Sequence, residues 1–342
     1  MIPAIFGIAG PALTADERAF FKDADPAGYI LFKRNCEDRA QLRALTDDLR
    51  TIHGREKTLI SIDQEGGRVA RMKPPVWHAY PPGEVFAKLY EVAPASAIEA
   101  ARANAMALGL DLAEAGVNVD CLPLLDVRQP GAHDVIGDRA LGEEPLRVAA
   151  LGRAVLDGLA LAGVAGVIKH IPGHGRAGAD SHKELPRVTA SDAELESDIA
   201  PFRALNSATI AMTAHIVYTA WDKARPATQS PHVIEAIIRQ RIGFDGLLLS
   251  DDLDMEALSG DVPERALRAI AAGCDVALNC WADMEDMVGI AKVLPPMGDK
   301  ALARLDRALA ATNINAPDMA AQADLLAKRD ALLVAAGLEA FG

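Results

Sequence analysis

The sequence Gly166-Val167-Ile168-Lys169-His170 is a short apolar run that ends in two chemically capable side chains. Its length and composition are typical of a strand that is buried on both faces. A glycine-rich loop follows and extends to His182. The same order, an apolar run, a polar tail and then a helical pattern, recurs along the chain. It predicts strands over residues 5–10, 28–32, 58–62, 117–123, 166–170, 209–215, 246–252 and 273–279.

Helical patterns lie between the predicted strands. After the second strand, one helix face carries Leu42, Leu45, Leu49 and Ile52. Asn35 is the predicted cap at the start of this helix and Gly54 the residue that ends it. Further helices are predicted over residues 94–115, 145–162, 190–206, 231–241 and 263–272. Repeated alternation of strand and helix favours an α/β fold, a (β/α)8 TIM barrel with right-handed parallel crossovers.

Two more amphipathic helices are predicted at the end of the chain, within residues 298–342. The connection that precedes them, near residues 294–298, contains Pro and Gly but is too short for a domain linker. We therefore expect a single domain over residues 1–342, in which residues 298–342 form C-terminal helices packed on the barrel.

Composition excludes several classes of partner. The formal net charge of −13 argues against nucleic acid, because a protein that binds it needs a basic surface. The apolar run in Met1–Gly10 is too short to span a bilayer and has no basic region before it. The four cysteines form no CxxC pair, which favours reduced thiols. We expect a cytoplasmic, monomeric enzyme that does not bind a membrane.

Polar residues follow most of the predicted strands. A barrel places its active site on the loops at the carboxyl ends of its strands, so these residues should converge on one mouth. They are Asp63, Arg71, Asp126, Lys169, His170, Asp180, His182, His215 and Asp251.

Asp251 comes directly after three leucines and has two interpretations. It could cap the next helix, or it could be a carboxylate at the barrel mouth that acts as a nucleophile or stabilises charge. Its neighbour Asp252 is the better candidate for the capping role.

His182 is the predicted proton-transfer residue. Asp180 lies two residues before it and could fix its tautomer and raise its proton affinity. A histidine on a loop can also be solvated and idle, but glycines at 173, 175 and 178 let this loop approach a ligand closely. We assign no chemistry to His174, which could hold the loop by hydrogen bonds.

Several motifs together resemble the family 3 glycoside hydrolases of the β-N-acetylglucosaminidase type. The first is Lys-His-Ile-Pro-Gly-His-Gly at Lys169–Gly175, followed by Asp-Ser-His at Asp180–His182. The other similar motifs are Asp63–Val69, Val135–Arg139, Met212–His215 and Ser250–Met255. The matches keep the family's order from about residue 5 to residue 280.

The resemblance implies a retaining, exo-acting hydrolase that removes terminal β-linked N-acetylglucosamine (GlcNAc) from muropeptides in peptidoglycan recycling. It implies that Asp251 is the nucleophile and that His182, oriented by Asp180, is the general acid/base. The groups that would bind sugar hydroxyls are Asp63, Arg71, Arg139, Lys169 and His170. No metal or organic cofactor is implied. Relatives that act on glucosides commonly draw their acid from a second domain, for which this chain has no room.

Two further expectations concern the loop after residue 170. Because the proton-transfer pair lies on a glycine-rich segment, we expect the loop to close over bound sugar. Arg176 is a candidate, by position only, for binding the carboxylates of a muropeptide at the rim.

Other functions stay open at this stage. His170, His174, Asp180 and His182 could be metal ligands, although the first strand offers no His or Asp. Lys169 could form a Schiff base. A non-catalytic muropeptide sensor would need the sugar-binding groups but neither Asp251 nor His182, and transfer of the sugar to phosphate would need the same residues as hydrolysis.

Overall fold

A computed structural model of the protein describes residues 1–55, 57–181, 183–315 and 317–341. Eight parallel strands close into one barrel, in the spatial order β1-β10-β9-β7-β5-β4-β3-β2. Their bounds are β1 Ile2–Gly7, β2 Pro26–Leu31, β3 Leu59–Ile62, β4 Val119–Asp120, β5 Ala165–Ile171, β7 Ile210–Thr213, β9 Leu247–Asp252 and β10 Val276–Asn279. Each of these strands overlaps a predicted strand, so the predicted barrel is confirmed.

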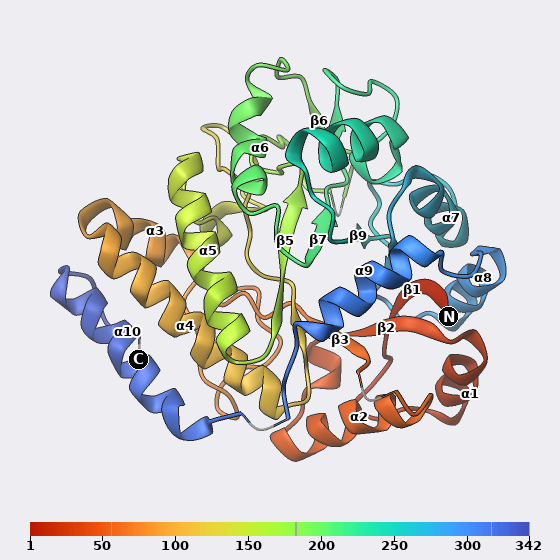
Figure 1. The fold of residues 1–342 in the computed structure, drawn as a ribbon, viewed down its shortest axis with the longest axis horizontal. Coiled ribbons are helices and arrows are strands. Elements are labelled where there is room, and N and C mark those ends of the chain that lie inside the picture. The colour runs from red at the N-terminus through yellow and green to blue at the C-terminus, as the bar shows by residue number, and fades with distance from the viewer. Residues whose placement is uncertain (56, 182, 316, 342) are drawn as a thin grey trace.

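Helices surround the barrel (Figure 1). They are α1 Ala15–Ala24, α2 Arg39–Thr51, α3 Gly83–Val92, α4 Pro94–Glu114, α5 Pro145–Leu161, α6 Leu195–Ala204, α7 Val262–Ala272, α8 Met284–Val293, α9 Asp299–Ala310 and α10 Gln322–Ala335, with a π-helical segment over Val233–Ile242. None of the helices in the described residues is long and apolar enough to cross a membrane.

Alternation of side chains divides the apolar core into two layers. Inward-facing residues such as Ile5, Val167 and Leu249 fill the barrel, and their neighbours pack outward against the helices. Because every strand is covered on both faces, its sequence reads as a continuous apolar run. The core therefore holds the strand ends, and the polar residues on them, in fixed positions.

The C-terminal helices are fastened to the barrel at two places. Leu305 and Leu309 of α9 belong to the cluster that fills the barrel interior. The other helix, α10, runs beside α4 (Figure 1), where the fully buried Arg329 donates to Oδ1 of Asn104 at 3.1 Å. Helix α9 thus contacts the barrel interior, and α10 contacts α4.

The start of α2 differs from the prediction. The cap of α2 is Asp38, whose side chain accepts from the backbone N–H of Gln41. Asn35 is instead buried, and its amide donates to the carbonyl oxygens of Ile8 and Gly10. A buried amide that joins the ends of two strands satisfies more backbone groups than an exposed cap would.

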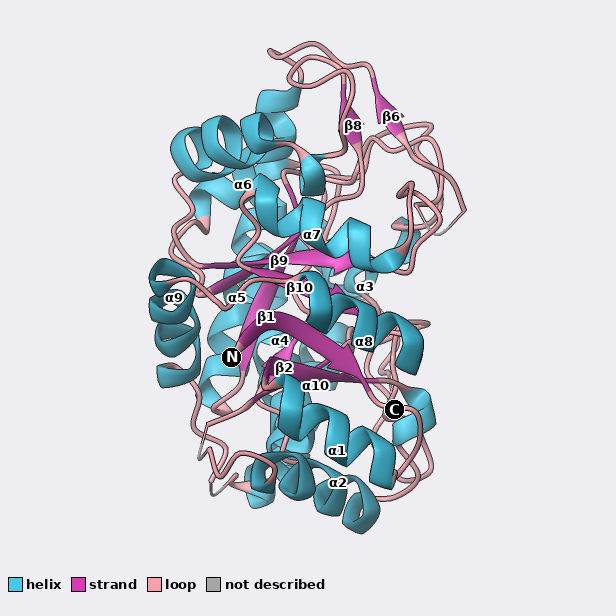
Figure 2. Cartoon of the chain, turned by 90° about the vertical axis from the view of Figure 1, so that its right-hand side faces the viewer, coloured by secondary structure: helices cyan, strands magenta, loops and turns pink. Residues whose placement is uncertain are grey.

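A small two-stranded parallel sheet, β6 Arg187–Val188 and β8 Val217–Tyr218, was not predicted. It stands apart from the barrel, as Figure 2 shows. Pairs of two residues are too short to produce a periodic pattern in the sequence.

Candidate active site

A cavity of about 260 Å³ opens at the carboxyl ends of the barrel strands. The predicted residues that reach it are Asp63, Arg71, Arg139, Lys169, His170 and Asp251. Other lining residues include Phe32, Glu65, His174, Ser181, Asp252, Met255 and Cys280. The structure therefore places most of the predicted residues around one cavity, and their individual roles remain predictions.

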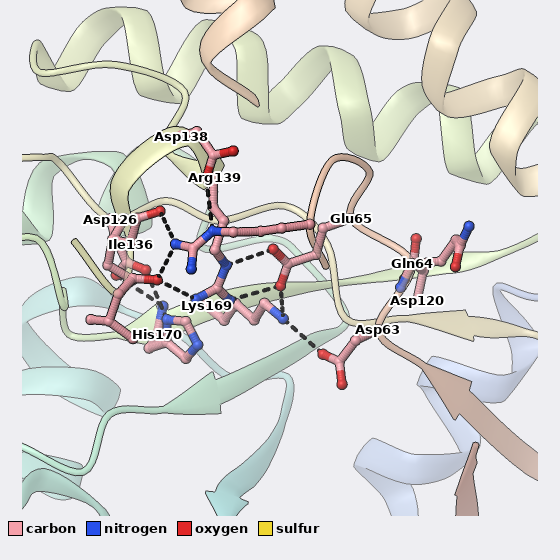
Figure 3. Close-up of polar contacts among 12 residues, drawn as sticks. Asp63, Gln64, Glu65, Asp120, Asp126, Ile136, Asp138, Arg139, Lys169 and His170 are labelled. Carbon is pink, nitrogen blue, oxygen red and sulfur yellow. Dashed lines mark hydrogen bonds and ion pairs between the residues drawn. The ribbon is translucent and has the colours of Figure 1, made fainter. Parts of the chain in front are cut away.

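A chain of ion pairs forms one wall of the cavity (Figure 3). Nζ of Lys169 lies 3.0 Å from Oδ1 of Asp63 and 2.6 Å from Oε1 of Glu65. Arg139 holds both oxygens of Glu65, at 2.7 and 2.8 Å. At the other end, Nη2 of Arg71 lies 3.2 Å from Oδ2 of Asp63. Three cations and two carboxylates thus alternate along the wall.

Glu65 was missed as a site residue, although its motif was recognised. It lies two residues after Asp63, and both follow β3. A carboxylate at this spacing after a strand end was a usable signal. What the sequence could not show is that Glu65 joins Lys169 to Arg139, since those residues are far from it along the chain.

The ion pairs keep the buried groups charged. Burial by itself would raise the pKa of Glu65, but Arg139 and Lys169 lower it to about 2. Burial would likewise lower the pKa of Lys169, but Glu65 and Asp63 raise it above its ordinary value. A lysine that stays protonated is a poor nucleophile, which argues against a Schiff base at this position.

Acid should destabilise the protein through Glu65. Its pKa is below the ordinary 4.5 in the folded chain, so its stabilising contribution is present above about pH 4.5 and is lost as the pH falls toward about 2. The expected contribution is about 3 kcal/mol. Urea unfolding of wild type and Glu65→Gln between about pH 7 and about pH 3 measures it. The gap in unfolding free energy between them should shrink on acidification, and a constant gap would contradict the assignment.

Asp126 orients the histidine next to Lys169. Its Oδ2 lies 2.8 Å from Nδ1 of His170, and its Oδ1 accepts the backbone N–H groups of His170 and His174. Burial opposes ionisation of Asp126, but the two histidines lower its pKa to about 2. With Nδ1 of His170 engaged by a carboxylate, Nε2 is the nitrogen left for a ligand.

The two other histidines at the mouth are buried. His174 lines the cavity, and burial together with His170 lowers its pKa to about 4. His215 is held on both sides, by Oγ1 of Thr228 at 2.7 Å and the carbonyl oxygen of Asp252 at 2.9 Å. His174 is thus neutral near pH 7, and burial lowers the pKa of His215 as well.

The pKa values of the consecutive carboxyl groups of Asp251 and Asp252 are shifted in opposite directions. Burial opposes ionisation of Asp251, but His170 and His215 hold its pKa below the ordinary value. Burial, and then the neighbouring Asp254, raise the pKa of Asp252 well above that value. Ionisation is therefore favoured at Asp251 and opposed at Asp252, at the end of β9, and an ionised carboxylate is the form that can attack carbon.

Neither Asp251 nor Asp252 caps the next helix, α7, so the capping interpretation is wrong for both. The cap of α7 is Asp261, which accepts from the backbone N–H of Glu264. Oδ1 of Asp251 accepts the N–H of Asp252 at 2.8 Å. Within the described ranges, no residue donates a hydrogen bond to its other oxygen, Oδ2, which leaves that atom for a ligand.

The loop that carries the predicted acid/base is only partly described. The carbonyl of Asp180 accepts the N–H groups of Lys183 and Glu184, which forms a turn. Ser181 lines the cavity, and its carbonyl accepts the N–H of Ala257 at 3.2 Å. His182 lies outside the described residues. The structure thus brings the loop to the cavity and leaves the role of His182 as a prediction.

Arg176 does not reach the rim of the cavity. Its Nε donates to Oδ2 of Asp198 at 2.6 Å, and its Nη2 donates to Ser197 and to the carbonyl of Glu194. The guanidinium therefore fastens the loop to α6. The positional prediction for Arg176 was wrong because sequence position does not show which way a loop side chain points.

Comparison with known proteins identifies the family of this chain. Residues 6–311 match the glycosyl hydrolase family 3 N-terminal domain. The β-hexosaminidase of Bordetella pertussis is 41% identical over 291 residues, which cover 83% of this chain and 81% of that protein. Native NagZ from Neisseria gonorrhoeae superposes with a TM-score of 0.86 at 31% identity, over 98% of this chain and 97% of that one.

A longer relative shares the same barrel. The structure of a glycoside hydrolase family 3 β-N-acetylglucosaminidase from Paenibacillus has a TM-score of 0.79 at 31% identity, and the match covers 96% of this chain and 61% of that one. The chain belongs to glycoside hydrolase family 3. Within the family it is a β-N-acetylhexosaminidase of the NagZ type.

Proposed function

We propose that this enzyme is a retaining exo-β-N-acetylglucosaminidase that releases GlcNAc from GlcNAc-1,6-anhydroMurNAc-peptides during peptidoglycan recycling. The observation that carries the proposal is Asp251, a carboxylate at a strand end that lines the cavity, has its pKa held below the ordinary value and receives no hydrogen bond at Oδ2 from the described residues. The cavity volume of about 260 Å³ lies below the ~300–1,000 Å³ of pockets for drug-sized ligands, which suits one terminal sugar ring.

The reaction would proceed in two displacements. Asp251 attacks the anomeric carbon while His182, oriented by Asp180, protonates the departing glycosidic oxygen. Water, deprotonated by His182, then attacks the anomeric carbon and releases the sugar from Asp251. Two displacements restore the β configuration, so GlcNAc leaves with the configuration that it had in the substrate.

The cation–carboxylate wall would bind the hydroxyls of the terminal sugar. The side chains of Asp63 and Arg71 are partly exposed, at 17% and 26%, whereas that of Lys169 is almost fully buried. These groups are held by one another before any sugar arrives. Such preorganisation accelerates the reaction to the extent that the contacts tighten in the oxocarbenium-like transition state.

The decisive assay follows the products by NMR. Purified enzyme is given GlcNAc-1,6-anhydroMurNAc-peptide, N,N′-diacetylchitobiose and a β-glucoside that carries the 1,6-anhydroMurNAc-peptide aglycone. GlcNAc should appear first as the β-anomer, and the glucoside should stay intact. First appearance of the α-anomer, or no release of GlcNAc, would refute the proposal. Formation of GlcNAc-1-phosphate in phosphate buffer would identify phosphate as the acceptor.

Removal of the acid/base should depend on the leaving group. A 2,4-dinitrophenyl leaving group needs no protonation, whereas a sugar alkoxide does. His182→Ala is expected to lower kcat/KM about 10²–10⁴-fold more for a disaccharide than for the dinitrophenyl glycoside. Asp180→Ala should change the same ratio in the same direction, and Lys183→Ala, on the same loop, should leave it unchanged. Equal losses on both substrates would remove His182 from this role.

Two further parts of the proposal have their own tests. Crystals with and without GlcNAc should differ in the position of residues 173–181 if the loop closes on sugar. Free thiols at Cys36, Cys121, Cys274 and Cys280 favour a reducing compartment, and cell fractionation with an antibody against the native enzyme would test a cytoplasmic location.

A further inference from the structure

Trp281 is an exposed aromatic side chain at the mouth of the barrel. Its relative exposure is 72%, and it directly follows Cys280, which lines the catalytic cavity. Among the described residues, the other large apolar side chains that are exposed all lie on helices around the barrel: Val92, Ile98, Leu146, Leu161, Leu267, Val293 and Val334. Trp281 alone in this set stands on a loop at a strand end, where ligands of a barrel bind.

The backbone beneath Trp281 is held firmly. Oδ2 of Asp254 accepts the N–H of Cys280 at 2.9 Å and that of Trp281 at 3.0 Å. Both oxygens of Asp254 also accept the amide of Asn279, at 2.9 and 3.0 Å. The next residue, Ala282, has a φ of 62°, a conformation that non-glycine residues rarely adopt. An exposed indole on a fixed, locally strained backbone points to a ligand contact.

Arg34 provides a positive charge beside the same loop. Its guanidinium donates to the carbonyl oxygens of Ile8 and Cys280, and it lies 4.8 Å from the centre of the Phe32 ring. In the part of the chain that the structure describes, no carboxylate lies within ion-pair distance of Arg34, and its Nη1 makes no hydrogen bond. A fixed guanidinium with a spare donor is suited to binding a carboxylate.

Both residues adjoin Cys280, which lines the catalytic cavity. Phe32 and Cys280, which Arg34 contacts, both line that cavity. Trp281 is one residue from Cys280, or about 3.8 Å along the backbone. A second sugar ring that leaves the cavity on this side would meet an aromatic surface and a cation together.

We infer that Trp281 and Arg34 form a subsite for the second, acidic sugar ring of the substrate. The indole stacks on the C–H face of that ring, and Arg34 binds a carboxylate carried by it, such as that of a lactyl ether. The inference rests on the proposed function and adds to it the residues that select an acidic aglycone.

Three substrates separate the contributions. GlcNAc β-fluoride has no second ring, N,N′-diacetylchitobiose has a neutral ring, and GlcNAc-1,6-anhydroMurNAc has an acidic ring. Trp281→Ala should lower kcat/KM about 10-fold for both disaccharides and leave the fluoride unchanged, with most activity retained in Trp281→Phe. Arg34→Gln should lower kcat/KM about 10-fold for the acidic disaccharide alone. Val293→Ala removes an exposed apolar side chain on α8 and should change none of the three values.

Other outcomes would overturn the subsite. If Trp281→Ala lowers all three values equally or lowers none, the indole does not bind the second ring. If Arg34→Gln lowers the neutral and acidic disaccharides equally, Arg34 does not bind the carboxylate. Failure of the wild type to hydrolyse any of the three substrates would instead refute the proposed function, so the two failures are distinguishable.

Discussion

Asp251→Asn should abolish turnover of a chromogenic β-N-acetylglucosaminide, with kcat reduced about 10⁴-fold or more. The amide keeps the shape of the side chain, and its oxygen can still accept the N–H of Asp252. It cannot form the bond to the anomeric carbon. The loss should therefore appear in kcat while the protein unfolds at nearly the wild-type temperature.

Asp252→Asn is the matched control. Because burial and Asp254 raise the pKa of the Asp252 carboxyl well above its ordinary value, an amide there replaces a group of the same shape whose negative charge is disfavoured. Activity should stay within about 10-fold of wild type. Mass spectrometry after reaction with a 5-fluoro glycoside should find the covalent sugar on Asp251. A label on Asp252, or a fully active Asp251→Asn enzyme, would contradict the assignment of the nucleophile.

Lys169→Met should lower both stability and activity. The Lys169 ammonium is 2% exposed and contacts Asp63 and Glu65. Its removal leaves the buried Glu65 carboxylate and the partly exposed Asp63 carboxylate with less compensation, which costs about 3–5 kcal/mol. The cation–carboxylate wall, which we propose binds the sugar hydroxyls, would also lose its central positive charge. We therefore expect kcat/KM to fall about 100-fold or more. Urea unfolding and the chromogenic assay measure the two effects.

A second substitution tests the cause of that loss. If uncompensated negative charge is responsible, Glu65→Gln in the Lys169→Met background should recover part of the lost stability. Lys57→Met is the control, because the contacts of Lys57 Nζ within the described residues are with the carbonyl oxygens of Leu309 and Thr312, away from the cavity. Lys57→Met should lower the free energy of unfolding only a little. A Lys169→Met protein as stable as wild type would show that the ion pairs contribute nothing net.

The sequence by itself determined the architecture. Strands buried on both faces read as short apolar runs, and each run here ends near a polar residue, so the strand ends could be located with the site residues on them. The sequence also contains local signals of other kinds, such as helix caps. Thr14 and Glu17 form a capping box at the start of α1, a helix that was not predicted.

Contacts between distant residues were decided by the tertiary structure alone. The Lys169–Glu65 pair joins β5 to the residues after β3, and Arg139 reaches Glu65 from another loop. The direction of a loop side chain was equally undetermined, as Arg176 shows by turning to Asp198 rather than to the cavity. Such contacts depend on which surfaces meet after the barrel closes, and no local pattern encodes them.

The charge of each carboxyl group was likewise a tertiary property. Asp251 and Asp252 are adjacent and identical in type, yet the pKa of the first is lowered and that of the second is raised. The difference comes from what surrounds each side chain: His170 and His215 lower the pKa of the first, whereas burial and the neighbouring Asp254 raise that of the second. The sequence could place an aspartate at the mouth of the barrel, but only the folded environment determines which of the two can act as a nucleophile.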